Sequence, residues 1–340
     1  MKRVLIGLAV AVALFLSAPA LHAYLKLGAR IGDRVVTLRW SQQPIRYFVT
    51  NRDDDFVSAD QLRQAVGRAF GSWNAVSSAN TSSQFAGFTS ALPFSEDGAF
   101  VIGFLSFENR PDLDNTLGAT TFEQDDVTGQ VIAADIFFND GFNWSAASGG
   151  LPGRFDLESV AVHEIGHLYG LGHSALGETE LVNAGTANEG RRVLGKRAVM
   201  FPIAYPTGNI EDRTPEADDI AGISDLYPAS GFSAQSGAIS GKVTLNGSGV
   251  FGAHVVAFNS TNGAMVGAFT LNSQGDFAMI GLKPGVYVVR VEPLDDGDID
   301  SFFDEDNPVN TNFRVAYYNK LVAVPAGGSS GSIEIKVQAK

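Results

Sequence analysis

Three histidines and a glutamate in one short stretch, HEIGHLYGLGHS at residues 163–174, have the spacing to bind and use a metal ion. On an α-helix, residues i and i+4 share a face with a rise of about 6 Å between them, so His163 and His167 can reach the same ion. Glu164 faces sideways, where it can hold a water molecule instead of becoming a ligand. With His173, three neutral imidazoles and an open position predict a catalytic zinc site. Structural zinc sites fill all four positions, usually with cysteine, and this chain has none.

His173 must reach the ion from outside that helix. A helix continuing through position 173 would rotate this side chain away from the shared face, so the chain has to turn after Leu168. Gly170 is the candidate for this turn, because glycine adopts the left-handed backbone that ends helices at little cost. The bare pattern H-E-x-x-H also occurs by chance in buried helices, but Gly170 and His173 at these offsets favour metal binding. The two other histidines are His22, near the N-terminus, and His254, far downstream.

The elements that must position this motif follow from capping and periodicity. Ser58 and Gln61 form a capping box, and Thr214 followed by Pro215 predicts the start of another helix. Apolar β-rich runs such as residues 131–138 lie between the first helix and the motif, so the first half is an α+β domain. The apolar faces consist of Leu62, Val66, Phe70 and Trp73 in the first helix and Ile220, Ile223, Leu226 and Tyr227 in the later one.

The histidine motif resembles that of the metzincin zinc proteases. Ser174, directly after the third histidine, is similar to the matrixin branch, which includes the matrix metalloproteases. Met200 and Pro202, in AVMFP, stand where the Met-turn of that family runs beneath the metal. The resemblance covers about residues 35–228. It implies a twisted mixed sheet with three main helices, and its other segments are PIRYFV, LRQAVGRAFGSWNAV, LGATTF, IAADIFFN and EADDIAGISDLYP.

The same resemblance implies a role for each site residue. One catalytic zinc ion would be bound by the three histidines of the motif, with Glu164 as the general base. Met200 would pack under the ligands without binding the metal. Tyr205 is the candidate for lining the pocket for the residue after the scissile bond, although its spacing differs by one residue from the common pattern.

The chain departs from that family at three points. No histidine occurs between His22 and His163, so we expect no second, structural zinc. Without cysteine, a propeptide thiol cannot keep the enzyme latent by occupying the metal. The stretch from Ala175 to Val199 is longer than the family places before the Met-turn, and its composition predicts a polar loop.

The second half of the chain has a different pattern. After a Gly/Ser/Ala stretch from Ala229 to Gly237, short β-rich runs alternate with glycine and asparagine turns, which is typical of a β-sandwich. Residues 239–293 resemble the carboxypeptidase regulatory-like, transthyretin-like modules, which are noncatalytic in most settings. His254 is predicted to be a strand residue, not a ligand. The expected organisation is a leader at 1–23, the zinc protease domain at 24–229, a linker at 230–238 and an all-β sandwich with an acidic extension at 239–340.

Two acidic segments are candidate calcium-binding sites. The run LDDGDIDSFFDEDN at residues 294–307 surrounds two phenylalanines with carboxylates, and could wrap Ca²⁺ with oxygen ligands. It lacks the fixed spacing of a dedicated calcium loop, so a solvated acidic loop is the alternative. Asp125 and Asp126 are a weaker candidate of the same kind. Asn246 and Gly247 are explained by hairpin-turn chemistry.

The N-terminus and the net charge indicate where the protein acts. Lys2 and Arg3, an apolar run from residue 4 to 16 and small residues up to Ala23 predict a secretory leader, cleaved after Ala20 or Ala23. An uncleaved anchor is the alternative, but a span needs about 20 apolar residues. Removal of the leader takes the formal charge of −13 to about −15. Such an acidic protein repels phosphate backbones, so we expect no nucleic acid as a partner. No later stretch is long and apolar enough to span a bilayer, so we expect no membrane as a partner after removal of the leader. The oligomeric state is left open.

These observations predict a secreted zinc-dependent endopeptidase that hydrolyses protein or peptide substrates. The alternative from another class is a secreted binding or adhesion protein with a catalytically idle zinc scaffold, although a scaffold has no chemical need for Glu164. Within the enzyme interpretation, a peptide or a cell-wall component could replace a structural protein as substrate, because specificity lies in pocket loops.

Overall fold

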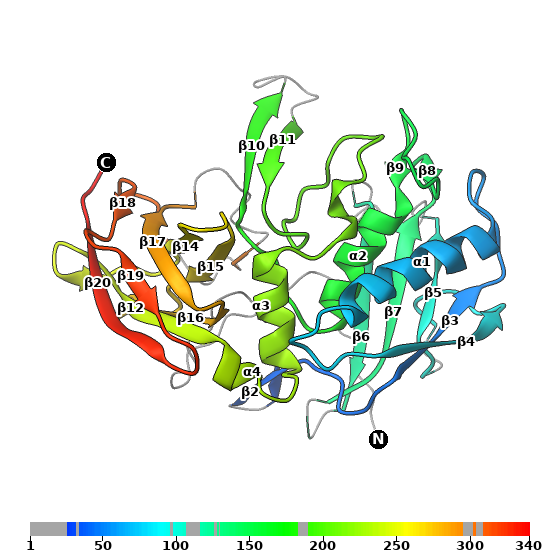
Figure 1. The fold of residues 1–340 in the computed structure, drawn as a ribbon. Coiled ribbons are helices and arrows are strands. Elements are labelled where there is room, and N and C mark those ends of the chain that lie inside the picture. The colour runs from blue at the N-terminus through cyan, green and yellow to red at the C-terminus, as the bar shows by residue number, and fades with distance from the viewer. Residues whose placement is uncertain are drawn as a thin grey trace.

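The computed structural model describes residues 26–31, 34–95, 98–106, 116–125, 128, 130–182, 190–294, 302–303 and 309–340. The predicted leader, Asp126 and all of the acidic run except Leu294, Phe302 and Phe303 lie outside these residues. The chain forms an α+β half and an all-β half that lie side by side (Figure 1). None of the described helices has the length and hydropathy needed to cross a bilayer.

A five-stranded mixed sheet forms the framework of the first half. Its order is β4 (Ser83–Thr89), β3 (Ile45–Thr50), β5 (Val101–Leu105), β7 (Val131–Asn139) and β6 (Gly118–Gln124). The first four strands are parallel to their neighbours, whereas β6 is antiparallel to β7 and lies at the edge. The expectation of a mixed sheet is confirmed.

Three helices complete this half: α1 (Ala59–Asn74), α2 (Leu157–Leu168) and α3 (Ala217–Leu226). The predicted capping box of Ser58 and Gln61 starts α1, which packs against α2. Helix α3 begins later than predicted, because the η2 turn (Glu211–Arg213) ends in extended backbone at Thr214. Glu216 then forms the capping box with Asp219. The sequence pattern identified the helix but misplaced its N-cap.

The second half contains two facing sheets. One consists of β13 (Ser248–Gly249), β12 (Gly237–Leu245) and β16 (Asp276–Leu282), with β20 (Ser329–Val337) parallel to β12. The other has the order β15 (Met265–Phe269), β14 (His254–Asn259), β17 (Gly285–Glu292) and β18 (Ala316–Tyr317), and β19 (Val322–Val324) also pairs with β17. Asn246 and Gly247 have φ angles of 53° and 87° and join β12 to β13, which confirms the predicted hairpin turn.

The two halves share one hydrophobic core. Buried residues of α3, such as Ile223, belong to the same cluster as Ile239 and Leu282 of the sandwich. The backbones of the two halves approach closely at Gly281, where an added Cβ would lie 3.1 Å from the Cα of Ala221 in α3. Residues 230–238, expected to be a linker, contain α4 (Phe232–Gln235) and the first residues of β12. The domain limits themselves stay a prediction.

Short pairs of strands surround the main sheets. β1 (Gly28–Ile31) pairs with β2 (Arg34–Thr37), and β8 (Trp144–Ser145) pairs with β9 (Phe155–Asp156). The stretch from Ala175 to Val199 contains an antiparallel hairpin of β10 (Gly177–Val182) and β11 (Gly190–Lys196), so its prediction as a polar loop was wrong. The hairpin rises beside the junction of the two halves (Figure 1). Its polar composition reflects exposure on a two-stranded ribbon, which hydrogen-bonds its own backbone.

Candidate metal centre

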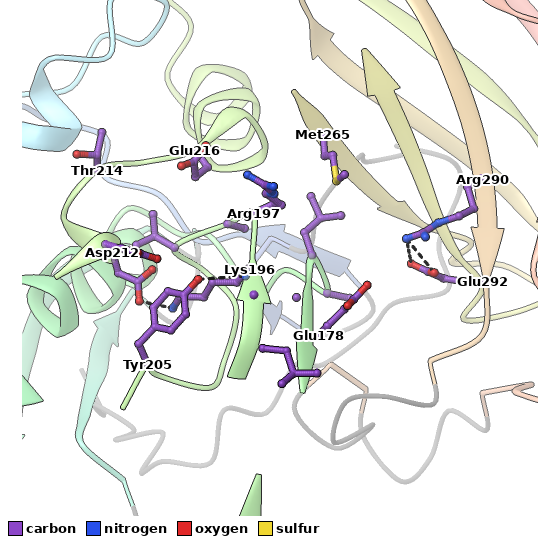
Figure 2. A pocket seen from close by; sticks show the side chains of 18 residues that line it. Glu178, Lys196, Arg197, Tyr205, Asp212, Thr214, Glu216, Met265, Arg290 and Glu292 are labelled. Atoms are coloured by element: carbon purple, nitrogen blue, oxygen red, sulfur yellow. Dashed lines mark hydrogen bonds and ion pairs between the residues drawn. The ribbon is translucent and has the colours of Figure 1, made fainter. Parts of the chain in front are cut away.

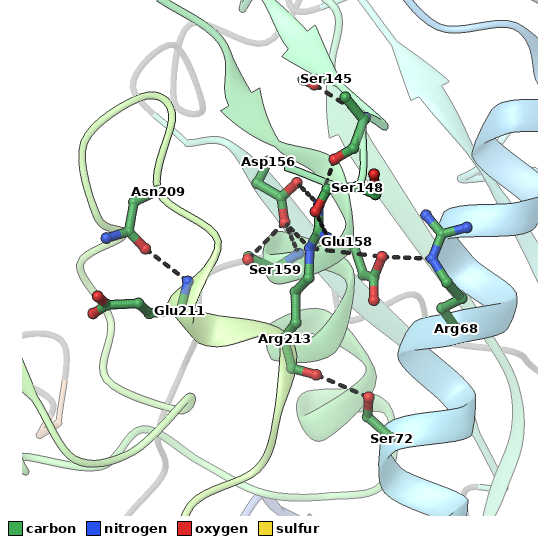
Figure 3. Close-up of polar contacts among 11 residues, drawn as sticks. Arg68, Ser72, Ser145, Ser148, Asp156, Glu158, Ser159, Asn209, Glu211 and Arg213 are labelled. Atoms are coloured by element: carbon green, nitrogen blue, oxygen red, sulfur yellow. Dashed lines mark hydrogen bonds and ion pairs between the residues drawn. The ribbon is translucent and has the colours of Figure 1, made fainter. Parts of the chain in front are cut away.

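Ion pairs with two buried carboxylates fix the start of α2. Asp156 caps the helix by accepting a hydrogen bond of 2.9 Å from the Ser159 backbone N–H, and Arg213 donates to both oxygens of the same carboxylate at 2.5 and 2.8 Å (Figure 3). Glu158, in the first turn, accepts from Arg68 of α1 at 2.6 Å. Negative charge at a helix N-terminus is favourable, so these contacts stabilise α2 and fix its position.

Gly170 ends α2 as predicted. Its φ is +97°, and a Cβ at this position would lie 2.1 Å from the carbonyl oxygen of Leu38. The backbone N–H of Leu171 then bonds to the Gly166 carbonyl at 3.0 Å, a closing bond typical of helix ends in left-handed backbone. The chain turns back within three residues and delivers His173 from the loop.

The structure brings the three predicted ligands together. One ring nitrogen each from His163, His167 and His173 lies within 4.8 Å of the other two. The ring centroids are separated by 4.7, 4.8 and 5.4 Å, with the rings inclined to one another. Within the part of the chain that the structure describes, this is the only cluster of three or more side chains able to hold a metal ion.

Hydrogen bonds to carbonyl groups set the tautomer of two rings. His163 Nδ1 lies 2.8 Å from the Val199 carbonyl oxygen, and His167 Nδ1 lies 2.8 Å from that of Leu171. Because a carbonyl oxygen only accepts, each Nδ1 carries the proton and each Nε2 keeps its lone pair for a metal. Burial lowers the pKa of His167 to about 3 and that of His163 well below its usual value, so both rings are neutral. This donor set fits zinc.

Glu164 lies beside the histidines and is 4% exposed. Its Oε2 is 2.9 Å from the Thr120 hydroxyl of β6, which is also 2.9 Å from the backbone carbonyl of Glu164. Burial raises the pKa of Glu164 to about 8, and the Thr120 contact opposes that shift. Thr120 is a candidate functional residue that the sequence did not identify, because only the packing of β6 on α2 reveals its contact with Glu164.

Met200 lies under the ligand helix. A Cβ at Gly166 would approach its Sδ to 2.2 Å, so the sulfur occupies the space next to the helix at Gly166. Asp219 accepts hydrogen bonds from the backbone N–H groups of Val199 at 2.8 Å and Met200 at 3.2 Å. Burial, followed by the neighbouring Asp218, raises the pKa of Asp219 to about 7.

Tyr205 lines a cavity of about 660 Å³ at the junction of the two halves (Figure 2). Its hydroxyl accepts a hydrogen bond of 3.2 Å from the Lys196 backbone N–H, and the Lys196 ammonium lies 5.2 Å from its ring centroid. Lys196 also pairs with Asp212 at 2.5 Å. Met265 and Arg290 of the sandwich close the other side. The role of Tyr205 in a substrate pocket stays a prediction.

The other residues considered as metal ligands are Asp125, His254 and the carboxylates of the acidic run. Asp125 accepts from the backbone N–H and the hydroxyl of Thr128, at 2.7 and 2.8 Å, as in a turn. His254 begins β14, as predicted, and its Nδ1 lies 3.1 Å from Glu292. The carboxylates of the acidic run lie outside the described residues, so calcium binding stays a prediction.

The comparisons agree with this geometry. Residues 39–184 match the Matrixin family, and the match includes all three histidines and Glu164. The chain is 28% identical over 194 residues to Metalloendoproteinase 1-MMP of Arabidopsis thaliana, which covers 56% of this chain and 44% of that protein. It is 32% identical over 179 residues to Metalloendoproteinase 5-MMP of the same plant, covering 49% of this chain and 40% of that protein. Metalloendoproteinase 1 of Glycine max is 31% identical over 183 residues, covering 49% of this chain and 46% of that protein.

These matches span less than half the length of each relative. The matched family region ends at residue 184, before Met200 and the whole β-sandwich. The family match and the three relatives support a matrixin-type domain in the first half of this chain. The resemblance of the second half to carboxypeptidase regulatory-like modules stays a prediction.

Proposed function

We propose that this protein is a secreted zinc-dependent endopeptidase. The observation that carries the proposal is the convergence of three neutral imidazoles with Glu164 beside them. The similarity of the first half to proteins named metalloendoproteinases supports the same conclusion. Secretion rests on the leader pattern at residues 1–23.

Zinc held by three imidazoles would lower the pKa of a coordinated water towards about 7 and polarise the carbonyl of the substrate. Glu164 loses its own proton more readily beside a divalent cation, because an opposite charge stabilises a carboxylate. The carboxylate then takes a proton from the attacking water and delivers it to the nitrogen of the leaving amine. One residue thus serves as general base and then as general acid, with Thr120 fixing its orientation.

The edge of the sheet is the proposed place for the substrate backbone. β6 pairs only with β7 among the described strands, and its Thr120 contacts Glu164. An extended peptide can add to such an edge through main-chain hydrogen bonds. This arrangement favours protein or peptide substrates over other amides.

Replacing Glu164 with glutamine tests the proposal. We expect Glu164→Gln to keep zinc binding, because none of the three ligands changes, and to lower kcat on a quenched peptide by about 10²- to 10⁴-fold. Glu334→Gln, at an exposed position of β20, is the matched control, because it makes the same chemical change away from the metal centre, and it should keep most of the turnover. Wild-type turnover by Glu164→Gln would remove Glu164 from the mechanism.

Two measurements on the wild-type protein distinguish an enzyme from an idle zinc scaffold. A scaffold would bind one zinc ion per chain in a titration and cleave no member of a mixed peptide library. An endopeptidase would give internal cleavage products from that library. N-terminal sequencing of the exported protein tests secretion, with Tyr24 or Leu21 expected as the first residue after cleavage.

A further inference from the structure

Phe302, from the sandwich half, packs against a metal-binding ring. Its ring centroid lies 6.4 Å from that of His173 in an edge-on arrangement, and its side chain is fully buried. On its other side Phe302 contacts Phe269 of β15 at 5.9 Å, and Phe269 stacks on His254 of β14 at 5.3 Å. A row of four rings therefore connects the third histidine of the motif to the middle of the sandwich.

A hydrogen-bonded path reaches the next residue of the same loop. The Ser174 hydroxyl donates to Asp218 Oδ2 at 2.6 Å, and Asp218 Oδ1 accepts from the backbone N–H of Gly267 in β15 at 2.8 Å. Ser174 is 4% exposed and Asp218 is 2% exposed. Both oxygens of this buried carboxylate are thus used, one toward the metal-binding loop and one toward the sandwich.

These contacts reach the one histidine of the three that does not lie on α2. His163 and His167 stand on one helix, and carbonyl groups orient both rings. His173 arrives after Gly170 on a loop, where rotation about its side-chain bonds is not limited by a helix. Both paths from the sandwich converge on residues 173 and 174, although they come through different side chains.

We propose that contacts from the β-sandwich orient His173 for metal binding, with Phe302 and Asp218 as positioning residues. Phe302 limits the orientation of the imidazole by packing, and Asp218 anchors the loop through Ser174. Residues that orient metal ligands typically change metal affinity by 10- to 100-fold when removed. The inference rests on the proposed metal site, but not on peptide hydrolysis.

Phe303 provides a matched control within the same chain. It is 1% exposed and contacts Phe269 at 5.4 Å, as Phe302 does, but its other ring contact is Phe251 of the sandwich, at 5.6 Å. Phe302→Ala and Phe303→Ala therefore remove rings of equal size from the same cluster. Only the first removes a contact with a metal-binding histidine.

The experiment measures zinc affinity of the full chain by competition with a chelating dye, without any substrate. We expect Phe302→Ala to weaken zinc binding at least tenfold, and Phe303→Ala to change it less than threefold. The visible absorption of the cobalt-substituted protein reports ligand geometry, and it should change in Phe302→Ala alone. Equal zinc affinity and equal cobalt spectra in the two variants would overturn the proposal.

Ser174→Ala keeps the proposal testable if Phe302→Ala does not fold. This change removes the hydroxyl that links the loop to Asp218, and it should also weaken zinc binding, whereas Ser174→Thr should restore it. Wild-type zinc affinity in Ser174→Ala would contradict the role of Asp218. Failure of the wild-type chain to cleave peptides, with zinc bound, would remove the protease proposal and leave this inference standing.

Discussion

The hydroxyl of Thr120 lies 2.9 Å from Oε2 of Glu164, so an edge strand of the sheet directly contacts the proposed general base. Among the described residues, no other group donates a hydrogen bond to this carboxylate. The contact explains how a glutamate that is 4% exposed keeps one orientation beside three histidines. It also connects the proposed substrate strand with the proposed proton acceptor.

Removing this hydroxyl should impair proton transfer. Thr120→Val preserves the shape of the side chain, but the pKa of Glu164 rises because its hydrogen bond is lost, so less carboxylate is present at a given pH. We expect kcat/KM at pH 7 to fall about 3- to 10-fold and its acid limb to move to higher pH. Thr121→Val, on the opposite face of β6, should leave the pH profile unchanged. Identical profiles for both variants would contradict the assignment.

Ionisation of Glu164 should also make the stability of the metal-free protein depend on pH. The unfolded chain ionises this group above about 4.5, whereas the folded protein keeps it protonated up to about 8. The contribution of Glu164 to the free energy of unfolding is complete below pH 4.5 and is lost as pH rises through about 8. The advantage of Glu164→Gln in unfolding free energy should therefore grow by a few kcal/mol across that window. Urea unfolding in chelator checks this, and a constant difference would argue against a buried acid.

Metal removal should abolish activity and lower stability together. Zinc at about 1,000 times its Kd adds about 4 kcal/mol to the free energy of unfolding, provided that it binds only the folded chain. A chelator should therefore lower the Tm, and added zinc should restore both the Tm and peptide hydrolysis. Acid should release the metal as well, because ligand imidazoles must be neutral, and burial, which lowers the pKa of His167 to about 3, places this release at strongly acidic pH. Activity that is indifferent to chelation would exclude a metal-dependent mechanism.

Helix α2 and Met200 are packed too closely for a larger residue at position 166. A Cβ there would lie 2.2 Å from Met200 Sδ and 3.0 Å from Trp73, so Gly166→Ala must displace one of them. We expect a loss of about 1–3 kcal/mol in unfolding free energy and weaker zinc binding. Gly71→Ala in α1, where no atom lies within 4 Å of the added Cβ, should instead gain up to about 1 kcal/mol. Chemical denaturation measures both changes, and a stabilising Gly166→Ala would show that the packing is looser.

Much of the metal centre could be predicted from local spacing. The i, i+4 relation of His163 and His167 follows from helix geometry, and Gly170 was identified because few other residues tolerate a φ of +97°. Ser58 with Gln61 and Asn246 with Gly247 were equally recognisable, since a cap and a hairpin turn depend on neighbouring residues. Each of these features uses interactions over only a few positions along the chain.

Contacts between distant segments could not be predicted in this way. Nothing in residues 118–124 indicates that Thr120 meets Glu164, and the acidic pair Asp218 and Asp219 resembles any polar helix start until both side chains are seen buried. Phe302 was noticed only as part of an acidic run, yet its ring packs on His173. Periodicity encodes which face of an element is buried, whereas the partner on that face is decided by how sheets and helices pack. The sequence by itself therefore determined the candidate ligands and the turn between them, and the tertiary structure decided what surrounds and orients them.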